Sequence, residues 1–139
     1  MKKFFNKILT RSDEDVLKAP ASPMIIAVDF DGTCVKEKYP KIGSDLPGAV
    51  ETLQALVARD HRLILWTCRE GQELEDAVNW FKEREIELFG INETPLDADF
   101  RPQGGRKVYA NLYIDDRTLE GFPGWSKIHQ ELIGMPLIL

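Results

Sequence analysis

The chain contains 139 residues, carries a formal net charge of −5 and is 43% apolar. This length suffices for one domain with its own hydrophobic core and argues against two domains. The acidic balance, with Lys and Arg scattered along the chain, argues against nucleic acid as a ligand. No apolar run approaches the roughly 20 residues that a membrane span requires. These bulk properties are typical of an ordinary globular domain.

Only two cysteines occur, Cys34 and Cys68, and polar residues interrupt the apolar positions of the first ten residues. An export signal requires an uninterrupted apolar region, so we expect a reducing, cytoplasmic setting without a disulfide. Residues 1–22 combine a short apolar pattern with an Ala- and Pro-rich linker. We interpret them as an N-terminal extension, which could form a docked helix, be disordered or contact a partner. Residues 23–139 are expected to form the core domain.

Strands and helices are predicted to alternate along this core domain. Continuous apolar runs predict buried strands, which cover residues 24–28, 62–66, 86–91 and 111–114. Apolar residues at helical spacing predict three helices, which begin at about Pro47, cover residues 72–84, and run from about Trp125 to the stop signal Gly134. The polar residues 92–106 are expected to be a functional or disordered loop. This alternation predicts a Rossmann-like, three-layer α/β/α sandwich with a mostly parallel sheet.

Polar side chains follow three of the predicted strands. Asp29 and Asp31 follow the first, Thr67 follows the second, and Asp115 and Asp116 follow the last. Ligands of open parallel sheets bind at the carboxyl ends of the strands, so these residues should meet in one site. Each alone has a plainer interpretation as a helix cap or turn residue. Four carboxylates at one sheet edge repel one another, however, and an all-oxygen cluster of this kind predicts Mg²⁺.

Three segments carry patterns that occur together in one superfamily. Residues 25–33 form an apolar strand followed by Asp-x-Asp-Gly-Thr, residues 63–67 an apolar strand ending in Thr, and residues 112–116 an apolar strand ending in paired acids. They resemble the first, second and fourth motifs of the haloacid dehalogenase superfamily, in the same order and spacing. The intervals between the motifs leave no room for a substantial cap domain. The resemblance therefore implies a capless, open-cleft core of this type over residues 23–139.

The resemblance also implies a reaction, the Mg²⁺-dependent hydrolysis of a phosphate monoester. Asp29 would attack phosphorus and form an aspartyl-phosphate. Asp31 would protonate the leaving alcohol and then activate the water that releases phosphate. The Mg²⁺ ligands that the resemblance implies are Asp29, Asp31 through its backbone carbonyl, Asp115 and Asp116.

Phosphate binding is implied for three further positions. Thr67 and Gly32 would contact phosphate oxygens, and Lys107 would supply the positive charge of the third motif. Lys107 lies only eight residues before Asp115, closer than in many members of the superfamily, so a solvated lysine at the end of a loop is its alternative interpretation. Arg69 could reach a substrate anion or pair with a neighbouring Glu. The tryptophans are expected in the core.

Several functions remain open at this level. The leading hypothesis is a phosphatase that acts on a phosphorylated small molecule or a larger phosphoester. A phosphotransferase or phosphomutase would use the same intermediate, but an uncapped site admits water. A binding module that has the fold without the activity is the non-enzymatic alternative. A homo-oligomer is one arrangement in which a second subunit would cover the open cleft.

Overall fold

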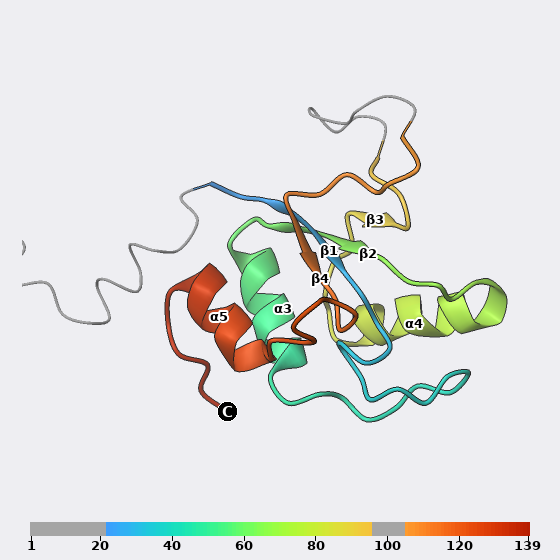
Figure 1. Cartoon of the computed structure of the whole chain (residues 1–139), viewed down its shortest axis with the longest axis horizontal. Helices are drawn as coiled ribbons and strands as arrows, with labels where there is room; N and C mark the ends of the chain where they lie inside the picture. The colour runs from blue at the N-terminus through green and yellow to red at the C-terminus, as the bar shows by residue number, and fades with distance from the viewer. Residues whose placement is uncertain (1–21, 96–104) are drawn as a thin grey trace, which may run out of the picture.

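Parallel strands form the centre of the structure, a computed structural model that describes residues 22–95 and 105–139 (Figure 1). Within these ranges the sheet has four strands in the order β3-β2-β1-β4, and every neighbouring pair is parallel. The strands are β1 (Ile25–Val28), β2 (Arg62–Leu65), β3 (Gly90–Ile91) and β4 (Leu112–Ile114). The predicted α/β, Rossmann-like fold with a parallel sheet is confirmed.

The central strand β1 sets the register of the sheet edge. All four of its residues are buried, as expected of an apolar strand that is covered on both faces. Its last residue, Val28, is paired with Leu65 of β2 and with Ile114 of β4. The three strands therefore end side by side, and the residues that follow them begin at the same edge.

The predicted strand over residues 86–91 is wrong in its length, because only Gly90–Ile91 are paired. Residues 85 and 86 follow the preceding helix, which ends at Glu83, and form the turn that caps its C-terminus. Glu85 adopts a left-handed conformation with φ of 55°, and the backbone N–H of Ile86 donates to the carbonyl of Phe81 at 3.0 Å. The chain reaches β2 only at Phe89, whose N–H donates to the carbonyl of Leu63 at 2.7 Å. Ile86 therefore lies in the turn that ends the helix, although its residue type favours a strand.

Three helices are found in the described part of the chain: α3 (Ala49–Ala58), α4 (Gly71–Glu83) and α5 (Trp125–Ile133). Each lies close to its predicted position, although α3 begins two residues after Pro47. Gly134 ends α5 in a left-handed conformation with φ of 81°, as its predicted role as a stop signal requires. In Figure 1, α3 and α5 lie side by side and α4 lies under the other part of the sheet.

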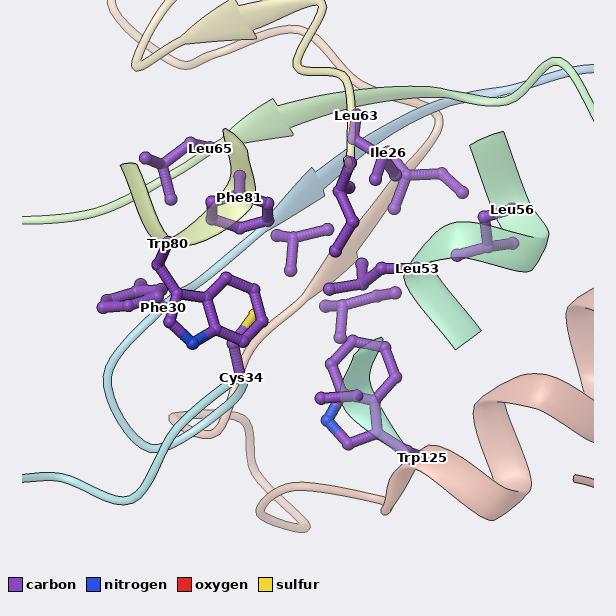
Figure 2. Packing of buried hydrophobic residues seen from close by; sticks show 14 of the residues in the cluster. Ile26, Phe30, Cys34, Leu53, Leu56, Leu63, Leu65, Trp80, Phe81 and Trp125 are labelled. Carbon is purple, nitrogen blue, oxygen red and sulfur yellow. The ribbon is translucent and has the colours of Figure 1, made fainter. Parts of the chain in front are cut away.

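The main hydrophobic core lies between these helices and one face of the sheet (Figure 2). Strand residues alternate between faces, so Ile26 and Val28 join this core whereas Ile25 and Ala27 belong to the opposite face. Each helix contributes buried side chains to the core, and Figure 2 labels Leu53 and Leu56 of α3, Trp80 and Phe81 of α4, and Trp125 of α5. Trp80 and Trp125 are therefore core residues, as predicted.

The opposite face of the sheet is covered differently. Its buried cluster consists of Ile25, Ala27 and Ile64 with Val108, and half-buried aromatic residues pack against them. In residues 22–95 and 105–139, this second cover is a loop segment, whereas the predicted three-layer sandwich has helices on both faces. The three helices pack on the face that contains Ile26 and Val28. The parallel register of β1, β2 and β4 places their carboxyl ends together.

Two predictions fall partly outside the described residues. The N-terminal extension is described only at residue 22, and residues 96–104 of the predicted loop 92–106 lie outside the structure. In the part of the chain that is described, no helix combines the length and the apolar character needed to cross a membrane.

Candidate functional site

A cleft of about 610 Å³ opens at the carboxyl ends of the strands. The sequence-predicted residues that line it are Asp29, Asp31, Thr67, Asp115 and Asp116. They come from the ends of β1, β2 and β4, which the register places side by side. The structure therefore brings together the polar residues that the sequence places after three separate strands.

Asp29 is fixed at the end of β1 by several hydrogen bonds. Its backbone N–H donates to the carbonyl of Ile114 at 2.9 Å, which ties it to β4. Its carboxylate oxygen Oδ2 accepts from the hydroxyl of the buried Thr33 at 2.9 Å. The thiol of the buried Cys34 donates to the carbonyl of Asp29 at 3.3 Å. The carboxylate of Asp29 is thus held in one orientation towards the cleft.

The charge environment of Asp29 is unfavourable for a carboxylate. Burial raises the pKa of Asp29 from 3.8 to about 7. The hydrogen bond from Thr33 lowers this pKa, whereas a hydrogen bond with Asp116 and the negative charge of Asp115 raise it. A positive charge in this place would therefore stabilise the ionised form of Asp29.

Asp29, Asp115 and Asp116 form a group that could hold a cation. Each is half-buried and offers one carboxylate oxygen, and the three oxygens lie within 4.8 Å of one another. Two ligands of one Mg²⁺ ion, each at about 2.1 Å from the metal, are at most about 4.2 Å apart. Small side-chain rotations would bring the three oxygens into this range. Hard oxygen donors of this kind fit Mg²⁺ better than softer metals.

Gly32 allows Asp116 to approach the first motif. Gly32 has a φ of 81°, which an L-residue rarely adopts, and its N–H donates to the carbonyl of Val35 at 2.8 Å. A Cβ atom at this position would collide with the carboxylate of Asp116. The glycine is therefore needed for both the turn and the position of the third carboxylate.

Asp31 lines the cleft but does not belong to the group of three acids. Both of its carboxylate oxygens accept hydrogen bonds from Arg69, Oδ2 from Nε at 2.6 Å and Oδ1 from Nη2 at 2.7 Å. These bonds raise the pKa of Arg69 above its ordinary value. Of the two alternatives that the sequence left for Arg69, an ion pair with the neighbouring Glu70 or Glu73 is not the one found, because the side chain turns towards Asp31 of the first motif.

Thr67 is held at the end of β2 by a residue that sequence reasoning did not select. Its backbone N–H donates to the side-chain oxygen of Asn92 at 2.8 Å, and its hydroxyl accepts from the N–H of Arg69 at 3.1 Å. Asn92 follows β3 directly and has a φ of 54°, which asparagine tolerates better than most residues. The neighbouring Cys68 is exposed, unlike the buried Cys34, and both thiols are free, as expected.

Lys107 is not among the residues that line this cleft. Its Nζ lies over the ring of Tyr113, 4.9 Å from the ring centroid. Tyr113 belongs to β4 and precedes Asp115 by two positions. The predicted contact of Lys107 with phosphate therefore requires its flexible side chain to leave this ring.

Besides Cys68, four other side chains in the cleft wall were not predicted as site residues. Trp66 is half-buried, packs against the second core cluster and also lines the cleft, and Arg117 directly follows the acid pair. Glu37 and Tyr39 come from the loop of residues 36–45, whose ends are joined by a hydrogen bond from the N–H of Lys36 to the carbonyl of Ser44 at 2.8 Å. Because Arg117 directly follows Asp115 and Asp116 in the sequence, it could have been predicted to line the cleft. The 36–45 loop carries no recognisable motif that would predict its place there.

The fold and the site together define a class of protein, a parallel α/β domain with a carboxylate-lined cleft at the strand ends. No protein-family model matches the chain, and no curated protein matches it significantly. The chain is similar to a solved structure described as a conserved protein from Bacteroides thetaiotaomicron, with 46% sequence identity and a TM-score of 0.70. The match covers 78% of this chain and 88% of the other, so the chain belongs to the same family as that conserved protein.

Proposed function

We propose that this protein is a phosphatase of the haloacid dehalogenase superfamily that hydrolyses a phosphate monoester with Mg²⁺ as its cofactor. The observation that carries the proposal is the convergence of carboxylate oxygens from Asp29, Asp115 and Asp116 within 4.8 Å, beside Thr67 in one open cleft. The order of the motifs in the sequence agrees with it. The free cysteines fit a cytoplasmic location, which is part of the same proposal.

The acid cluster supports a bound cation, with Asp29, Asp115 and Asp116 as its side-chain ligands. When bound, Mg²⁺ would lower the repulsion between the phosphate and the carboxylates and stabilise the charge that develops during transfer. The carbonyl of Asp31 is a further ligand that the superfamily resemblance implies. Burial, with Asp116 and Asp115 beside it, raises the pKa of Asp29 to about 7, and a bound cation would favour the ionised form.

In the proposed reaction, a carboxylate oxygen of Asp29 forms a bond to phosphorus while the bond between phosphorus and the leaving oxygen breaks. Asp31, which has to be protonated when the substrate binds, gives this proton to the leaving oxygen. A water molecule then gives a proton to Asp31 and attacks phosphorus. The bond between phosphorus and Asp29 breaks, which releases inorganic phosphate and restores both side chains.

The phosphate would be bound by hydrogen-bond donors of the cleft. The hydroxyl of Thr67 accepts a hydrogen bond from the backbone of Arg69, so its own proton can be donated to a phosphate oxygen. Gly32 has no side chain that would hinder the approach of phosphate to Asp29. Arg117 lines the cleft and can supply positive charge together with Lys107.

A binding module without activity is a second candidate, and the position of Lys107 favours it. The third motif of the superfamily requires a cation next to the phosphoryl group, whereas Lys107 lies over Tyr113. A phosphotransferase is favoured less, because the open cleft gives water access to a phosphorylated Asp29. All acids that the reaction needs are nevertheless present, which favours the phosphatase.

The proposal is tested by p-nitrophenyl phosphate turnover in the presence of Mg²⁺ and of EDTA. We expect turnover that EDTA abolishes and added Mg²⁺ restores, and that Asp29→Asn reduces by at least about 10⁴-fold. Asp60→Asn is a matched control, because this acid is exposed and lies outside the cleft. If neither this ester nor any of a panel of phosphometabolites is hydrolysed by the folded protein, the binding module replaces the phosphatase.

A further inference from the structure

Arg69 is a buried cation in the wall of an otherwise acidic cleft. Its side chain is 1% exposed, although the residue lines the cleft and follows Thr67 by two positions. An arginine offers five N–H donors, and a buried arginine usually has them paired. The role of Arg69 can therefore be inferred from the groups that accept its hydrogen bonds.

Two of the five donors bind the carboxylate of Asp31, at 2.6 and 2.7 Å. This is the fork geometry in which a guanidinium group fixes a carboxylate most strictly, because two parallel bonds define both its position and its plane. The side chain of Asp31 is itself only 18% exposed. Asp31 is thus held from one side by a partner that solvent hardly reaches.

The other three donors bind backbone carbonyls. Nη2 donates to the carbonyl of Lys41 at 2.9 Å, and Nη1 donates to those of Pro40 at 3.2 Å and Glu73 at 3.3 Å. Lys41 and Pro40 belong to the 36–45 loop, and Glu73 lies in the first turn of α4. Arg69 therefore joins Asp31, this loop and a helix in one hydrogen-bonded unit.

Two aromatic rings enclose the guanidinium group. Its central carbon lies 5.2 Å from the ring centroid of Phe30 and 5.2 Å from that of Tyr39. Phe30 is fully buried in the core, whereas Tyr39 is 54% exposed and lines the cleft. The rings fix the plane of the guanidinium group, and Arg69 in turn fixes the loop residue Tyr39 at the cleft.

These contacts exclude a role of Arg69 as a phosphate ligand, since all five N–H groups are already used. We propose that Arg69 is a positioning residue, which fixes the carboxylate of Asp31 for proton transfer to the leaving group and ties it to the 36–45 loop. This inference rests on the phosphatase function proposed above. According to this inference, the 36–45 loop lies next to the leaving group of the substrate. The loop would do so in place of a cap domain, for which the sequence leaves no room.

The inference predicts a dependence on the leaving group. p-Nitrophenolate is a stable anion and leaves with little help, whereas an alkoxide requires a proton as its bond to phosphorus breaks. Displacement of the Asp31 carboxylate should therefore affect an alkyl phosphate far more than p-nitrophenyl phosphate. Loss of a phosphate ligand would affect both substrates alike, because both carry the same phosphoryl group.

The experiment compares kcat/KM for p-nitrophenyl phosphate and for β-glycerol phosphate in Arg69→Lys, Asp31→Asn and the double variant. kcat/KM reports the first transfer to Asp29, so later hydrolysis does not obscure the comparison. For Arg69→Lys we expect a loss of about 10²-fold or more with the alkyl ester and less than about tenfold with the aryl ester. Asp31→Asn should show the same selectivity, and the double variant should lose little more than Asp31→Asn alone.

Arg62→Lys is the matched control. Arg62 also lies over an aromatic ring, that of Phe89 at 4.7 Å from the centroid, but it is outside the cleft. It should leave the ratio of the two kcat/KM values unchanged. Equal losses with both esters in folded Arg69→Lys would overturn the inference while leaving the phosphatase function intact.

A second variant covers the case in which Arg69→Lys does not fold. Asp31→Glu keeps the charge but moves the carboxylate by one methylene, and we expect it to show the same selective loss with β-glycerol phosphate. A wild-type ratio in Asp31→Glu would show that a fixed carboxylate position is not required, and it would overturn the inference. If the unmodified protein hydrolyses neither these two esters nor any of the panel of phosphometabolites, the proposed function itself fails, which is a distinguishable result.

Discussion

The carboxylate of Asp31 and the group of three acids lie at the same sheet edge but differ in their positively charged partners. Asp31 has a buried arginine as its partner, with two hydrogen bonds of 2.6 and 2.7 Å. Asp29, Asp115 and Asp116 make no ion pair with a Lys or Arg side chain within residues 22–95 and 105–139. Asp31 is therefore paired within the protein, whereas the group of three acids is the place of the proposed cation. The variants below test this difference.

After Asp29→Asn, the largest effect is expected from Asp115→Asn, which removes one negative ligand from the group of three acids. We expect Mg²⁺-dependent kcat/KM to fall on the order of 10³-fold. The reason is that the cation is proposed to stabilise the charged transition state by several kcal/mol. The Mg²⁺ concentration for half-maximal activity should rise as well. An unchanged Mg²⁺ dependence in this variant would remove Asp115 from the metal site.

A smaller but selective loss is expected from Gly32→Ala. The new Cβ would meet the carboxylate of Asp116, and φ is 81° at this position. Gly121→Ala is the matched control, because φ is 78° there and nothing lies near the added Cβ. Both variants should lose about 1 kcal/mol of unfolding free energy, measured by denaturant titration, from the strained backbone. Only Gly32→Ala should also lose phosphatase activity.

A moderate loss of activity is expected from Lys107→Ala. The ammonium group lies over Tyr113 and has to leave this ring to approach a phosphate. We therefore expect kcat/KM to fall by about 10- to 10²-fold, less than for Asp115→Asn. Lys127→Ala on the exposed side of α5 is the control, and it should have the activity of the unmodified protein. Wild-type rates in Lys107→Ala would leave this residue as a surface lysine.

The smallest expected effect concerns stability and pH. Burial raises the folded-state pKa of Asp29 to about 7, above its ordinary value of 3.8. Its contribution to metal-free stability is therefore full below about pH 4 and is lost as the pH rises through 7. Mg²⁺ binds the ionised form, so its stabilising effect should grow over the same range. Thermal unfolding at pH 5 and pH 8, with and without Mg²⁺, should show the larger shift at pH 8. A larger shift at pH 5 would contradict this protonation scheme.

Much of the site could be predicted from the sequence because it depends on one property of parallel sheets. Strands that end together bring the residues after them together, so Asp29, Thr67 and Asp115 could be assigned to one cleft. The pairing of Asp31 with Arg69 could not, because it joins residues 38 positions apart and no local pattern distinguishes this acid from Glu73. It depends on how the side chain of Arg69 packs between two rings.

The extent of the secondary structure was less predictable where two elements compete for the same residues. Residues 86–89 have the composition of a strand. Ile86, however, is part of the turn at Glu85 that ends α4 and therefore does not pair with β2. Within the described residues, Val108 and its neighbours pack on the second sheet face, and no periodic pattern in the sequence marks this loop as part of the core. In both cases tertiary packing decides between locally equivalent alternatives.

The central claim is that acids from separate strands hold one cation next to a nucleophilic Asp29. The most direct measurement is a crystal structure of the protein with Mg²⁺ and beryllofluoride, which mimics a phosphoryl group on an aspartate. We predict a metal ion bound to the side chains of Asp29 and Asp115 at about 2.1 Å, with beryllium bonded to Asp29. A metal ion bound elsewhere, or a beryllofluoride group on any other residue, would contradict the account.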